Sequence, residues 1–184
     1  HNNFQPFAAT NFNALTGENL RGPEFSFDAV EVVNSSAMQS DWMLNFRDWM
    51  ALLNYGHRVT AVGSSDVHDV SRYIVGQGRT YISVDDTDVA KINLEKACDA
   101  VLAGRVLVSM GLLADMKVAG RYWVGELARD LPGLIPVTLS VQGPGWTAVD
   151  LVQLYANGEL VREERFDAIT TPGEKKRVTW NWPK

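Results

Sequence analysis

The segment VTAVGSSDVH, residues 59–68, contains the pattern that decides the fold. Its first five residues are β-branched or small, which predicts a short buried strand. Upstream, residues 27–33 read FDAVEVV and are apolar on both faces except for Asp28 and Glu31. Strands of this kind are typical of the interior of parallel sheets. We therefore expect two parallel strands, 27–33 and 59–63, in one sheet.

A helix is expected between these strands. Ser40 or Asp41 can cap its start, Gly56 can end it, and an apolar stripe at helical spacing is formed by Trp42, Phe46, Trp49, Met50 and Leu53. A strand, a helix and a strand in this order predict one βαβ crossover.

The alternation of strand and helix continues to about residue 113. Residues 79–84 and 105–109 are predicted strands, and the helix predicted between them carries Leu94, Ala97, Cys98, Val101 and Leu102 on one stripe. As the single cysteine of the chain, Cys98 is expected to be a small core residue. Residues 1–113 are therefore expected to form an α/β domain.

The pattern changes from residue 114 onward. No helical stripe is present there, while residues 137–141, 150–155 and 177–180 alternate or cluster like strands. Asn157-Gly158 predicts a two-residue hairpin, because a type I′ turn needs positive φ at both central positions. The sequence predicts an all-β, β-sandwich-like module over 114–184.

Bulk composition narrows the class of protein. Of the 184 residues, 46% are hydrophobic and 21% are charged, which is ordinary for a globular chain. The net charge of -5 and the absence of a basic stripe argue against nucleic acid as a partner. No apolar run approaches the roughly 20 residues of a membrane helix. The compartment, cytoplasmic or exported, cannot be inferred from the sequence.

Asp66-Val67-His68 is the sharpest chemical signal. On extended backbone, residues two apart share a face, so we expect the carboxylate of Asp66 and the imidazole of His68 to converge on one cation. This donor pair suits Zn, Mn or Fe. The alternative is a solvated loop in which Asp66 makes only a local hydrogen bond.

Three further side chains are candidates for the same site. Glu31 is costly in an apolar strand unless it is paired, protonated or near metal, and a structural pair with Arg58 or Arg79 is the alternative. Asn34 follows three residues later and can line the same rim or simply make the turn. Arg79 can bind a phosphate or carboxylate, or form a surface salt bridge.

An ordered succession of motifs resembles the PHP (polymerase and histidinol phosphatase) superfamily of metal-dependent hydrolases, in particular its CehA/McbA-like branch. The motifs are residues 27–34, 48–56, 60–68, 78–81, 103–111 and 154–158. The resemblance implies the C-terminal part of a distorted (βα)7 barrel, related to the TIM barrel, that binds two or three Zn, Mn or Fe ions. It also implies hydrolysis of a small phosphoester or related ester by metal-activated water.

Residue by residue, the resemblance makes Asp66 and His68 metal ligands. Glu31 and Arg79 become candidates for catalysis, and Asn34 and Arg79 for substrate binding. The family's early His-x-His motif and middle acid are missing, because the chain begins at His1 without an initiator Met. We therefore expect an incomplete, weakly active or inactive fragment, whose barrel a missing N-terminal segment or a second chain completes.

The second function class is a non-catalytic module that binds carbohydrate or protein. An exposed row of tryptophans in the β half would favour it over core packing of Trp123, Trp146, Trp180 and Trp182.

Overall fold

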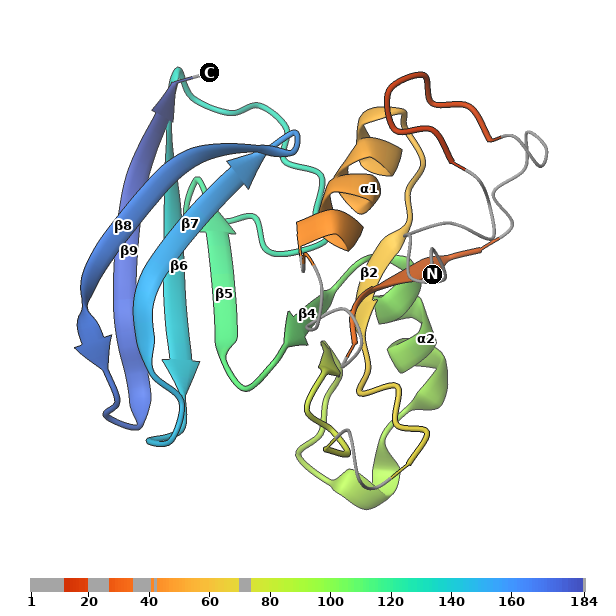
Figure 1. The fold of residues 1–184 in the computed structure, drawn as a ribbon, viewed down its shortest axis with the longest axis vertical. Helices are drawn as coiled ribbons and strands as arrows, with labels where there is room; N and C mark the ends of the chain where they lie inside the picture. Colours follow the sequence, from red (N-terminus) through yellow and green to blue (C-terminus); the bar gives the residue numbers. More distant parts are fainter. Residues whose placement is uncertain (1–11, 20–26, 35–40, 42, 70–73, 184) are drawn as a thin grey trace.

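The computed structural model describes residues 12–19, 27–34, 41, 43–69 and 74–183. Within these ranges the chain is mostly β, with nine strands, two α-helices and one short 3-10 helix. Figure 1 shows two parts, an α/β part that holds both α-helices and a β module made only of strands. The chain passes from one to the other between β4 and β5.

The predicted βαβ crossover is present. Strand β1 (Ala29–Val33) pairs in parallel with β2 (Thr60–Gly63), and helix α1 (Met43–Asn54) connects them. The carboxylate of Asp41 accepts a hydrogen bond from the backbone N–H of Met43, so Asp41 caps the helix as predicted. The alternative cap, Ser40, lies outside the described residues, as does Trp42. The helix packs against β1, and its Leu52 is fully buried.

The next strands run differently from the prediction. Strand β3 (Arg79–Ile82) pairs antiparallel with β4 (Val106–Ser109). The 3-10 helix η2 (Val89–Lys91) and helix α2 (Leu94–Leu102) lie between them. Because β3 and β4 are antiparallel, this helix does not make a second parallel crossover.

The predicted part of a (βα)7 or TIM-like barrel is therefore wrong. Among the described residues only β1 and β2 are parallel, and the strands form four small sheets of two or three strands instead of one closing barrel. The helix predicted between β3 and β4 is present as α2, but its apolar stripe is only partly covered, because Leu94 is 76% and Leu102 is 59% exposed. Cys98 is exposed and is not a core residue.

The β module consists of two sheets that share one core. Its strands are β5 (Leu113–Val118), β6 (Leu134–Gly143), β7 (Val149–Ala156), β8 (Glu159–Ile169) and β9 (Gly173–Pro183). One sheet has the order β5-β6-β9 and the other pairs β7 with β8. Buried valines from both sheets meet in the core, namely Val141, Val149, Val152 and Val178.

The hairpin predicted at Asn157-Gly158 is confirmed. The two residues connect β7 to β8 and have φ values of 55° and 93°, as a type I′ turn requires. The tip of this hairpin also contacts the α/β part, because the side-chain amide of Asn54 donates to the carbonyl of Asn157.

None of the helices in the described ranges combines the length and the apolar character that crossing a membrane requires.

Candidate functional site

The loop that leaves β2 holds Asp66 and His68. Its backbone is not extended, as the sequence reasoning assumed, because Asp66 has a φ of 48° in the left-handed region. This turn nevertheless brings the two side chains together. The Nδ1 atom of His68 lies 3.6 Å from Oδ1 of Asp66 and 2.9 Å from the carbonyl oxygen of the same residue.

The contact with the carbonyl oxygen decides which ring nitrogen of His68 is available. With Nδ1 protonated and donating to that oxygen, neutral His68 carries its lone pair on Nε2. Metal-binding histidines commonly use one nitrogen for the ion and donate the other N–H to a carbonyl or carboxylate. The side chain of His68 is 76% exposed, so Nε2 is open to a ligand from solvent.

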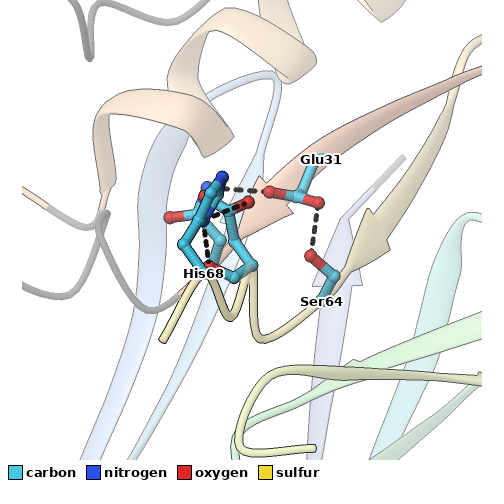
Figure 2. A network of polar contacts seen from close by, with 5 residues as sticks. Glu31, Ser64 and His68 are labelled. Atoms are coloured by element: carbon cyan, nitrogen blue, oxygen red, sulfur yellow. Dashed lines mark hydrogen bonds and ion pairs between the residues drawn. The ribbon is translucent and has the colours of Figure 1, made fainter. Parts of the chain in front are cut away.

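Glu31 lies at the same edge of the sheet, because β1 and β2 are parallel and both end there. Its Oε2 atom accepts a hydrogen bond of 2.5 Å from the hydroxyl of Ser64, and its Oε1 atom accepts one of 2.7 Å from the amide of Asn34. Figure 2 shows Glu31 with Ser64 and His68 in one network of polar contacts. The alternative pairing of Glu31 with Arg58 or Arg79 is not observed.

Two close contacts position the loop between β2 and β3. The backbone of Gly78 is so close to the carbonyl of Ser64 that a Cβ atom at this position would lie 2.2 Å from its oxygen. The Thr80 hydroxyl lies 2.8 Å from both the backbone nitrogen and the carbonyl oxygen of Gly63. These contacts fix the start of β3 against the end of β2.

The backbone of Arg79 lies at this edge of the sheet, but its side chain does not take part in the network. Its side chain is exposed, and no hydrogen bond or ion pair to another described residue is formed by its guanidinium. The structure therefore brings together Glu31, Asn34, Asp66 and His68, whereas Arg79 stands beside them without contact.

As metal ligands the described residues are an incomplete set. Asp66 and His68 offer a carboxylate and an imidazole, the donors that Zn, Mn and Fe accept. No group of three or more His, Cys, Asp or Glu side chains able to hold an ion is found in the described ranges. The chain has three histidines, of which His57 follows α1 and His1 lies outside the described residues.

Two residues of this region were not predicted. Ser64 directly follows β2 and donates its hydroxyl to Glu31. Asp48 on α1 is half-buried, and this burial raises its pKa from 3.8 to about 6. The signal for Asp48 was its spacing, because Asn45, which contacts Val32, and buried Leu52 lie on the same face of the helix.

The four tryptophans of the β half do not form one exposed row. Trp180 packs against the core cluster, and the guanidinium of Arg162 covers the ring of Trp182 at 5.2 Å. Trp146 is 89% exposed on the loop between β6 and β7, and Trp123 is 49% exposed between β5 and β6. This arrangement lacks the feature that would have favoured a carbohydrate-binding surface.

Comparisons of the chain with known protein families, with curated proteins and with solved structures found no match.

Proposed function

We propose that the edge formed by Asp66, His68 and Glu31 is part of the metal site of a PHP-type hydrolase that acts on a small phosphoester or related ester. The observation that carries the proposal is the geometry of His68, whose Nδ1 is engaged by the Asp66 carbonyl 2.9 Å away while Nε2 is open. The succession of PHP-like motifs in the sequence supports the same assignment.

In this proposal Nε2 of His68 and the carboxylate of Asp66 hold the cation, and the carboxylate, which lies beside Nδ1 in the structure, turns toward Nε2 to do so. A bound Zn, Mn or Fe ion supplies water of lowered pKa and polarises the scissile bond. Glu31 accepts hydrogen bonds from Ser64 and Asn34, so it orients these two polar side chains beside the ligands. Arg79 is exposed next to this edge and can reach the anionic part of a substrate.

Because the described residues supply only two protein ligands, we expect metal binding to be weak. Catalytic zinc sites commonly use three protein ligands and one water, and the described residues supply two. We expect the remaining ligands to come from outside the described residues. The chain by itself should therefore turn over p-nitrophenyl phosphate and p-nitrophenyl acetate at close to background rates, with Zn or Mn added.

The first experiment is a titration with MnCl₂ followed by the imidazole C–H signals in proton NMR. A paramagnetic ion broadens the signals of the histidine nearest to it, so the signals of His68 should broaden before those of His57. In Asp66→Asn the same broadening should need at least about tenfold more Mn, because losing even a partner of a ligand costs that much affinity.

His57 is the control inside the same molecule, since it follows α1 and is not a neighbour of Asp66 in sequence. Equal broadening of both histidines, or an unchanged titration in Asp66→Asn, would contradict the metal assignment. Stoichiometric binding of Zn with nanomolar affinity in calorimetry would contradict the two-ligand site. Ester hydrolysis that persists both in Asp66→Asn and in the presence of EDTA would contradict the assignment of a metal-dependent hydrolase.

A further inference from the structure

A pocket of about 530 Å³ lies between the α/β part and the β module, away from the site above. It is lined by the end of β3, the start of β4, a residue of β5 and the segment 123–126. The candidate metal edge lies toward the opposite end of β4, where Met110 approaches Gly78 and Gly78 abuts Ser64. The pocket is therefore a separate site.

Aromatic and aliphatic side chains make up most of its wall. Tyr81 and Trp123 are 41% and 49% exposed although they are large and apolar, and Ile82 beside them is 39% exposed. Val106, Leu107 and Val124 complete the apolar lining. A volume of this size with apolar walls and few polar groups is typical of a site for a small organic molecule.

The charged side chains around the pocket differ in whether they already have a bonding partner. The backbone N–H of Trp123 donates to Glu126 at 2.6 Å, so that acid is occupied as a local cap. Asp115 also lines the pocket, and its charge acts on Arg177, whose guanidinium is already bonded to Glu174. By contrast, the guanidinium of Arg105 has no hydrogen bond or ion pair with the described part of the chain.

A second positively charged side chain lies next to the pocket. The ammonium of Lys117 lies 4.1 Å from the ring centroid of Trp123. An uncommitted guanidinium and a ring-bound ammonium thus flank a pocket in which one of the two acids, Glu126, is already engaged by a backbone N–H. Planar guanidinium groups bind carboxylate, sulfonate and phosphate in bidentate fashion.

We infer that this pocket binds a planar aromatic molecule that carries one anionic group, with its ring against Trp123 and Tyr81 and its anion on Arg105. The pocket shares no lining residue with the metal site.

The test uses calorimetry on the full chain with three naphthalene probes of equal ring size. These are 2-naphthalenesulfonate, neutral 2-naphthol and the cation of 2-naphthylmethylamine. We expect the sulfonate to bind about tenfold more tightly than the naphthol, as one charge-assisted contact predicts, and the cation to bind most weakly. In Arg105→Gln the preference for the sulfonate should disappear, whereas in Trp123→Ala all three probes should weaken.

Each variant has a matched control. Arg58→Gln removes an exposed arginine from another part of the chain, and Trp146→Ala removes an exposed tryptophan of the β6–β7 loop. Both should bind the sulfonate like the unchanged chain. If Trp123→Ala fails to give a folded circular dichroism spectrum, Tyr81→Ala takes its place. Absence of saturable binding, stronger binding of the cation, or a sulfonate affinity unchanged by Arg105→Gln would each overturn the inference.

Discussion

The backbone of a single residue determines whether Asp66 and His68 can act together. A left-handed φ of 48° is tolerated by Asp because its short carboxylate can bond locally, and it bends the loop so that two side chains meet. An uncommon backbone conformation at a site of this kind is an observation from which function can be proposed. The sequence identified Asp66 and His68 as candidates, but it did not predict the turn that brings them together.

Asp48 gives a pH-dependent prediction at the same scale. Burial raises its pKa from 3.8 to about 6, so the folded chain holds this proton more tightly than the unfolded chain does. The free energy of unfolding should therefore fall as the pH rises from about 4 to 6 and stay lowered above that range. The shift corresponds to about 3 kcal/mol, which we reduce to about 1 kcal/mol because the half-buried carboxyl retains solvent screening.

Asp48→Asn removes this cost. Thermal unfolding at pH 7.5 should show a midpoint about 2–4 °C higher than that of the unchanged chain, and at pH 3.5 the two should coincide. Asp99→Asn, a change of an exposed helical acid on α2, is the control and should not show this pH dependence. A gain of equal size at both pH values would contradict the assigned cause.

At the scale of elements, local pattern predicted where strands and helices form but not how they pair. Strands β1, β2, β3 and β4 and both helices lie close to their predicted ranges, because alternation and helical periodicity are local properties. The direction of β3 relative to β4 depends on the segment 83–93, which carries no such period. For that reason the extension from one βαβ crossover to a barrel failed.

Helix α2 shows the same limit. Its apolar residues recur at helical spacing, yet Leu94, Cys98 and Leu102 are exposed and only Ala100 is fully packed. Periodicity indicates that a helix has an apolar face, and it does not indicate whether a neighbour covers that face.

Helix α1 offers a matched pair of leucines that tests its packing on the sheet. Leu52 is completely buried, whereas its neighbour Leu53 is 41% exposed. Leu52→Ala should lower the free energy of unfolding by about 2–5 kcal/mol, because it leaves a cavity in the core. Leu53→Ala should cost less than about 1 kcal/mol. Urea denaturation measures both, and equal losses would mean that α1 does not pack as described.

At the scale of the whole molecule, close contacts between the two parts position the aromatic pocket. The hairpin tip at Asn157 accepts from Asn54 on α1, and the segment 123–126 crosses the end of α2 at Gly104. Gly104 ends that helix with a φ of 72°, and Gly125 has a φ of 85°. The sequence predicted the hairpin, but contacts between residues far apart in the chain have no local signal.

Gly125→Ala tests this junction. A Cβ atom at Gly125 would lie 2.5 Å from the carbonyl carbon and oxygen of Gly104 and 2.7 Å from the carbonyl oxygen of Ala103. These are backbone atoms that cannot rotate away, and the left-handed φ alone costs about 1–2 kcal/mol for a residue with a Cβ atom. We expect a total loss of about 3 kcal/mol in urea denaturation, together with weaker binding of 2-naphthalenesulfonate, because Trp123 would move with the displaced segment.

Gly133→Ala is the control for this change, since it lies in the same connection between β5 and β6. A Cβ atom there meets nothing within 4 Å, and its φ is not positive. It should leave probe binding unchanged and alter stability by no more than about 1 kcal/mol, in the stabilising direction, through the unfolded state. If both glycine variants behaved alike, the segment 123–126 would not be held against α2, and the pocket would lose the wall that Trp123 provides.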